Sequence, residues 1–179
     1  MVDAASNRGM EMLARIGLLG LVLVTVLAGP VAGRSGPTGK WGEIDGWQIR
    51  VDDGCFALRG VADGTVIRIG IKANTQSVYF YIGNDAWRSF VPGQLYPIRF
   101  VYDDETAFNG EIGAYPWLGK VVLGHRDVGP DFIESFTRST TLRLFHRGTQ
   151  IADFPLRDAA AAIRQVMACR DEWSAKSES

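Results

Sequence analysis

The chain has 179 residues, of which 19 are lysine or arginine and 20 are aspartate or glutamate, so its formal net charge is −1. Proteins that bind nucleic acid or an anionic membrane surface usually carry a basic excess, and we therefore expect neither as a partner. The part after residue 33 has the length of one ordinary domain, which can bury a core without a structural metal ion.

The first 33 residues have the pattern of a secretory signal peptide. Arg8 and Arg15 precede an uncharged run from Ile16 to Ala28, and small residues follow it. The run is about 13 residues long, shorter than the roughly 20 of a membrane-spanning helix, so we expect cleavage and no retained span. Pro30 stands where a lipid-bearing cysteine would be needed, so we expect no lipid anchor. The pattern predicts a periplasmic or secreted protein.

Three further parts are expected after the signal peptide. Residues 34–40 form a flexible lead-in, residues 41–173 a single β-rich domain, and residues 174–179 a polar tail. Within the domain, alternating apolar and polar residues between turn-forming residues predict short antiparallel strands. These strands cover residues 47–52, 55–59, 67–71, 78–82, 96–102, 121–123, 142–144 and 151–154. Residues 103–118 are expected to be irregular.

Two helices are predicted in the second half of the chain. Asp131 has the spacing of a cap for a brief helical turn that ends at Phe136. Asp158 is expected to cap a helix from Ala159 to Arg170, with Cys169 on its apolar face. The whole pattern predicts a mainly β fold, an antiparallel β-sandwich or barrel with a C-terminal helix laid on the sheet.

Cys55 and Cys169 are the two cysteines of the chain. In an oxidising compartment such a pair favours a disulfide, which would tether the C-terminal helix to the sheet. Two free buried thiols are an alternative. A redox pair is a weaker one, because no Cys-x-x-Cys spacing holds the thiols together.

Carboxylates are the residues best suited to an enzymatic interpretation. Asp103 and Asp104 follow an aromatic strand and Glu111 lies in the same segment, so a pair of them is a candidate acid and base for glycan hydrolysis. Acidic residues after a strand are more often a solvated turn, and we expect no catalytic residue. With only two histidines, His125 and His146, we also expect no metal site and no cofactor.

Aromatic residues are the better candidates for a binding site. Trp47 and Trp87 fit the pattern of a core. Trp117 stands in a glycine-rich segment and, with nearby Tyr115, is predicted to contact a protein partner or to stack on a sugar ring. Packing in the core is the alternative for Trp117.

A resemblance to a known family rests on Trp47, Cys55, the β-rich middle and the closing series Leu156, Ala162, Val166 and Cys169. Over residues 41–170 the chain resembles small exported alphaproteobacterial proteins related to the invasion-associated locus B family, although it has fewer cysteines than they have. The resemblance implies a periplasmic or secreted β-sandwich without established catalytic residues. We therefore expect a non-enzymatic interaction domain with a protein or cell-envelope partner; the alternative is a glycan-directed hydrolase or sugar-binding domain that uses residues 102–117.

Overall fold

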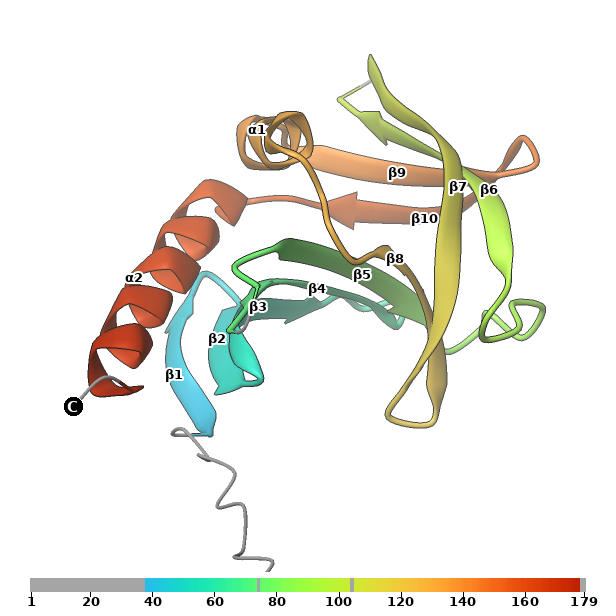
Figure 1. Cartoon of the computed structure of the whole chain (residues 1–179). Helices are drawn as coiled ribbons and strands as arrows, with labels where there is room; N and C mark the ends of the chain where they lie inside the picture. Colours follow the sequence, from blue (N-terminus) through green and yellow to red (C-terminus); the bar gives the residue numbers. More distant parts are fainter. Residues whose placement is uncertain (1–37, 74, 104, 178–179) are drawn as a thin grey trace, which may run out of the picture. The chain divides into compact units, whose positions relative to one another are not determined.

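The structure is a computed structural model that describes residues 38–73, 75–103 and 105–177 (Figure 1). The predicted signal peptide and most of the lead-in lie outside these residues. The elements in chain order are β1 (Gly39–Ile44), β2 (Trp47–Asp52), β3 (Gly54–Gly60), β4 (Thr65–Lys72), β5 (Val78–Asn84), β6 (Leu95–Tyr102), β7 (Glu105–Trp117), β8 (Lys120–His125), α1 (Pro130–Arg138), β9 (Thr141–His146), β10 (Thr149–Pro155) and α2 (Ala159–Ser177). None of these helices is long and apolar enough to cross a membrane.

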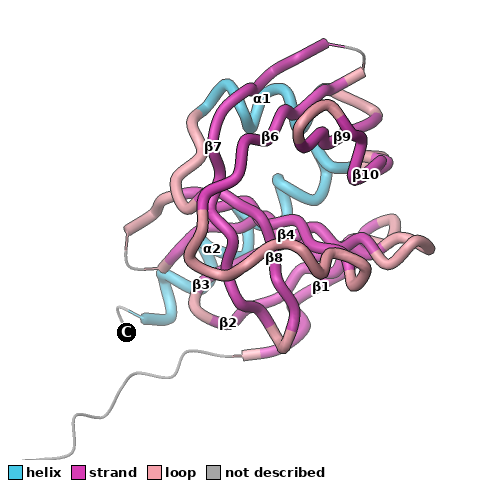
Figure 2. Tube along the Cα trace, turned by 90° about the vertical axis from the view of Figure 1, so that its right-hand side faces the viewer, coloured by secondary structure: helices cyan, strands magenta, loops and turns pink. Residues whose placement is uncertain are grey.

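All ten strands form one antiparallel sheet, in the order β1-β2-β3-β4-β5-β8-β7-β6-β9-β10. Figures 1 and 2 show that this sheet folds over, with β1 to β5 in one layer and β6, β9 and β10 in the other. The predicted mainly β fold with a C-terminal helix is therefore confirmed.

Strand β7 belongs to both layers. Its residues 105–113 pair with β6, and its residues 113–117 pair with β8. The prediction of an irregular segment over 103–118 was wrong, because this stretch is a strand of 13 residues. A bulge opposite Phe100 and Val101 interrupts the alternation, and Gly110 and Gly113 carry no side chain that would mark a face. The alternation that predicts a strand is lost for these two reasons.

The core lies between the two layers. Trp47 of β2 is fully buried, and its ring centroid lies 6.0 Å from that of Phe136 and 6.1 Å from that of Phe154. Its indole Nε1 donates to the carbonyl oxygen of Arg157 at 2.9 Å, just before α2 begins. Trp47 thus joins β2, α1, β10 and the start of α2, as its predicted place in the core requires.

Helix α2 is attached to the sheet by the Cys55–Cys169 disulfide, which confirms the predicted tether. Both cysteines are buried, and small or branched residues of the same helix face pack beside Cys169 against β1 to β4. Regular structure begins at Gly39 and continues to Ser177, so it extends past the expected domain boundaries at 41 and 173.

Helix α1 begins differently from the prediction. Gly129 is its N-cap, no side chain caps it, and Pro130 occupies the first helical position. Asp131 lies inside the first turn, so its predicted capping role was wrong. A proline at the first position has a φ angle already suited to the helix and lacks an N–H that a cap would have to satisfy.

Candidate functional site

An aromatic–arginine face covers the outer side of the sheet from β3 to β7. Arginine side chains alternate with rings on this surface: Arg68 lies over Phe56 at 3.8 Å, and Arg126 lies over Tyr115 at 4.5 Å, both measured from the guanidinium carbon to the ring centroid. We define the aromatic–arginine face as Phe56, Arg68, Tyr79, Tyr81, Tyr115 and Arg126; Phe56 and Tyr79 are buried, with Arg68 lying over both rings.

The tyrosine rings connect the two arginines. Tyr79 and Tyr81 are neighbours on β5 with centroids 5.3 Å apart, and Tyr81 meets Tyr115 edge to face at 5.5 Å. Arg68 Nε donates to the hydroxyl of Tyr79 at 2.9 Å. These contacts hold the rings in one arrangement, and rigid aromatic side chains suit recognition because little entropy is lost on binding.

Glycines make room for these rings. A Cβ at Gly113 would come within 2.6 Å of the Tyr115 hydroxyl, and a Cβ at Gly124 within 2.3 Å of the Tyr81 ring. Gly113 and Gly124 are paired across β7 and β8, so both rings lie on the backbone of the same two strands. The ring positions therefore depend on residues that have no side chain.

The electrostatics of this face are governed by its two guanidinium groups. Burial raises the pKa of both Tyr79 and Tyr81, although Arg68 and Arg126 respectively lower it in part, so both phenols stay protonated at neutral pH. Within the described part of the chain, neither Arg68 nor Arg126 forms an ion pair with a carboxylate. The face thus presents positive charge that is free to meet an anionic group.

The structure brings the two predicted binding residues together. Tyr115 and Trp117 are two apart on β7, and alternate residues of a strand share a face. Trp117 pairs with Lys120 at a tight turn that presents Leu118, which is 82% exposed. Lys120 also pairs with Asp85 at 2.6 Å and so attaches this turn to the loop after β5.

The carboxylates are not brought together. The carboxylate of Asp103 accepts hydrogen bonds from the backbone N–H groups of Thr140 and Thr141 at 2.9 and 2.8 Å, and also from both hydroxyls. These bonds hold its pKa below the usual value and give it a structural role. Asp103 follows Tyr102, which pairs with Glu105 at the start of β7, whereas Glu111 pairs with Pro97. About six residues of extended strand therefore separate Glu111 from the end at which Asp103 lies, a distance of roughly 20 Å. A glycosidase pair needs about 5–10 Å. Asp104 lies outside the described residues.

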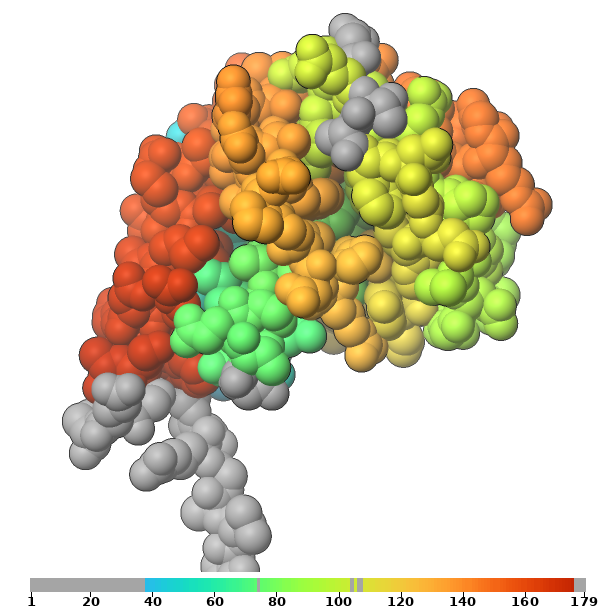
Figure 3. Space-filling view, turned by 45° about the horizontal axis from the view of Figure 1, so that its top comes forward, coloured from blue at the N-terminus to red at the C-terminus, as the bar shows by residue number. Residues whose placement is uncertain are grey.

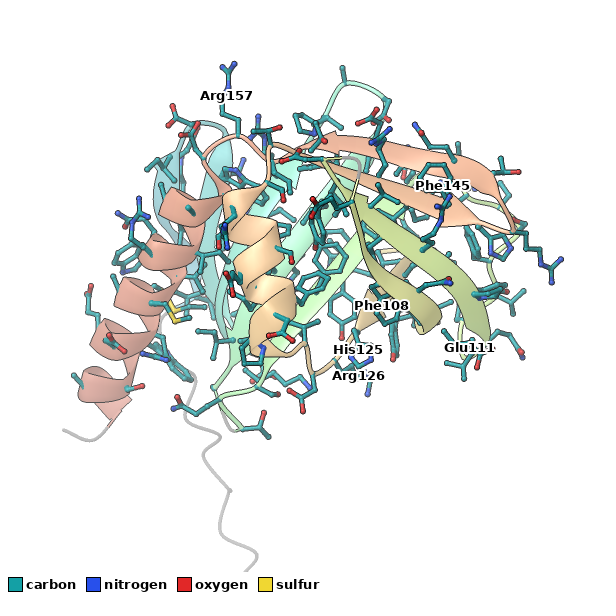
Figure 4. The ribbon with its side chains drawn as sticks, turned by 90° about the horizontal axis from the view of Figure 1, so that it is seen from above. Phe108, Glu111, His125, Arg126, Phe145 and Arg157 are labelled. Carbon is teal, nitrogen blue, oxygen red and sulfur yellow. A yellow bond between two sulfur atoms is a disulfide. The ribbon has the colours of Figure 1, made fainter. Side chains whose placement is uncertain are left out.

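A second feature, which we call the phenylalanine pocket, lies inside the fold. It is a cavity of about 110 Å³, lined chiefly by Phe80, Phe100, Phe108, Ile112 and Phe132. His125 and Asp127 also line it, and because both are exposed they mark its mouth. Figure 4 shows His125 beside Phe108. The sequence did not predict this pocket, because its rings come from four different elements.

The geometry defines a mainly β, disulfide-closed domain whose aromatic side chains gather at an outer face and in one pocket. No protein-family model and no curated protein matches the chain. Its fold is similar to that of a crystal structure of invasion associated protein B from Bartonella henselae, with a TM-score of 0.53 and 14% identity, covering 75% of this chain and 99% of that one. The resemblance inferred from the sequence is thus confirmed as a likeness of fold.

Proposed function

We propose that this protein is an exported, non-enzymatic interaction domain of the cell envelope, and that its aromatic–arginine face binds a protein partner. The observation that carries the proposal is the stack of Arg126 on Tyr115, 4.5 Å apart, beside Tyr81. A guanidinium held over a ring and unpaired with a carboxylate in the described chain is suited to an acidic side chain of a partner.

Export is supported by the N-terminal sequence pattern and by the single disulfide, which forms and persists in oxidising compartments. The name of the structural neighbour, invasion associated protein B, also fits a protein that acts at or beyond the cell surface.

Sugar binding on the same face is the second candidate. Its support is the position of the Tyr115 ring, which lies over Gly113 on the outside of the sheet. Stacking on a sugar needs an open ring face, however, and Arg126 covers one face of Tyr115. This arrangement favours a partner that brings carboxylates over one that brings sugar rings.

The test is crosslinked affinity capture from the envelope fraction with the tagged protein and its variants. We expect one reproducible protein partner, with capture reduced about tenfold or more by Arg126→Glu or Tyr115→Ala, because such residues act as hot spots. Trp117→Ala should weaken capture less. The matched control is Arg164→Glu, a charge reversal at an exposed position of α2. Equal capture by Arg126→Glu would contradict the proposal, and retention on peptidoglycan or other glycans would favour the second candidate.

A further inference from the structure

Among the described residues, no strand pairs with the outer edge of the first half of β7. Residues 108–112 pair with β6 on one side, and the pairing of β7 with β8 on the other side begins only at Gly113. Strand β8 ends at His125, where the chain turns away, and the N–H of Val128 donates to the carbonyl of Val78 at 2.8 Å. The backbone of β8 therefore leaves β7 at this point. Alternate N–H and C=O groups along a strand edge without a neighbour are available to another chain.

The phenylalanine pocket opens beside this edge. Phe108 and Ile112 come from β7 itself, while Phe132 comes from α1 on the other side of the cavity. Figure 3 shows the surface hollowed between α1, in orange, and β7, in yellow. We call the free edge of residues 108–112 together with this pocket the β7 gap.

The rim of the β7 gap is acidic. Asp127 lies at the mouth of the pocket, and its backbone N–H points to Nδ1 of His125 at 3.4 Å. A neighbouring depression of about 510 Å³ contains Glu105, Asp131 and Glu134, of which Glu134 pairs with Arg138. The hydroxyl of Tyr102, which also lines that depression, is buried without a hydrogen-bond partner among the described residues. These groups would meet a basic chain favourably.

We propose that the β7 gap binds an extended peptide, which pairs with residues 108–112 as an added strand and inserts one aromatic side chain into the phenylalanine pocket. A lysine or arginine two residues before that side chain, on the same face of the extended peptide, faces Asp127 and the acidic depression. This second site consists of other residues than the aromatic–arginine face, and its rim is acidic where that face is basic. The proposal is therefore independent of the proposed function.

The size of the pocket sets the class of side chain. A cavity of about 110 Å³ is somewhat smaller than the engineered cavity of about 150 Å³ that admits benzene, so one ring of that size fills it. Its walls are already arranged for rings: Phe80 and Phe100 meet at 82°, and Phe100 and Phe132 at 87°. A further ring finds both faces and edges to contact, which favours phenylalanine or tyrosine over an alkyl chain. Main-chain pairing with side-chain pockets is a general mode of peptide recognition.

The experiment titrates the disulfide-closed protein with a short threonine-rich peptide that carries one phenylalanine and, two residues before it, one lysine. Nuclear magnetic resonance follows the amide signals of residues 108–112 and of His125. We expect these signals to shift together. Replacing the phenylalanine of the peptide by alanine should weaken binding about tenfold or more, because a buried ring is lost. N-methylation of alternate peptide amides should weaken it similarly, since it removes donors to the strand edge.

Two protein variants, each with a matched control variant, locate the contacts. Val128→Phe fills the pocket and should abolish the response, whereas Val91→Phe makes the same change at a loop position that is 55% exposed and should leave it intact. Asp127→Asn should reduce binding of the lysine peptide several-fold, and exposed Asp153→Asn should not.

The proposal would be overturned by no shift at residues 108–112 at millimolar peptide, by equal binding of the N-methylated peptide, or by shifts confined to Tyr115 and Arg126. The N-methylated peptide decides the matter on the unaltered protein even where Val128→Phe fails to fold. A dimer in light scattering, with slow exchange of the amides of residues 108–112, would show that a second copy of the chain occupies the edge and would likewise overturn it.

Discussion

The two helices close the fold in different ways. On the α2 side, small and branched residues pack closely on β1 to β4, and the Cys55–Cys169 disulfide joins helix and sheet. On the α1 side, Phe132 stands opposite the free edge of β7, and a cavity of about 110 Å³ remains among the rings. Beneath α2 the close packing leaves a void of only about 10 Å³, whereas the large rings beside the unpaired strand leave a pocket of side-chain size.

The two sides also differ in what holds them. The α2 side has a covalent bond between elements that are 114 residues apart in sequence. The end of α1 is followed by Thr140 and Thr141, which are held by hydrogen bonds to the carboxylate of Asp103. A reductant should therefore act on the first side, and acid should act on the second.

Reduction of the disulfide should have the largest effect on stability. A loop of this length is expected to contribute up to about 4–5 kcal/mol to the free energy of unfolding in the chain-entropy model. Urea unfolding with and without reductant measures it, and we expect a lower midpoint after reduction. The double variant Cys55→Ala/Cys169→Ala is the control and should not respond to reductant. An unchanged midpoint in the unaltered protein would show that the bridge adds nothing.

Removal of one ring from the core and one from the open edge of the pocket should have unequal effects. Phe136 is fully buried and contacts the rings of Trp47 and Phe80, so Phe136→Ala should cost about 3–5 kcal/mol. Phe108 is only half-buried at the open edge, so Phe108→Ala should cost about 1 kcal/mol. Chemical unfolding of both variants gives the comparison. Similar losses would mean that the edge of β7 at Phe108 is packed as closely as the core.

The sequence predicts the strands in which apolar and polar residues alternate. Ile67, Ile69 and Ile71 lie on the inner face of β4, and alternate residues of a strand share a face whatever its neighbours are. Tyr115 and Trp117 lie in a segment without this alternation, and their shared strand face follows only from the structure. No alternation in the sequence shows that β7 pairs first with β6 and then with β8, because this pairing depends on where the partner strands end.

The candidate sites were harder to predict because their contacts join distant parts of the chain. Tyr81 comes from β5 and Arg126 from the segment after β8, and only the sheet order brings them to Tyr115. Conversely, Asp103 and Glu111 are close in sequence, but an extended strand separates them. Nearness in sequence is a reliable guide within a helical turn and a poor one along a strand.

The smallest expected effect is the pH dependence of the Asp103 contacts. Hydrogen bonds from Thr140 and Thr141 lower the pKa of Asp103 in the folded protein below its usual value near 4. The unfolded chain then binds the proton more readily, so this contribution to stability is fully present above the unfolded pKa and is lost as the pH falls through the folded pKa. Melting temperatures of the unaltered protein and of Asp103→Asn, compared from neutral pH down to about 3, should converge in acid. Exposed Asp153→Asn serves as the control and should follow the unaltered protein throughout. A constant difference between Asp103→Asn and the unaltered protein at every pH would mean that the carboxylate positions α1 and β9 by its shape alone, without its charge.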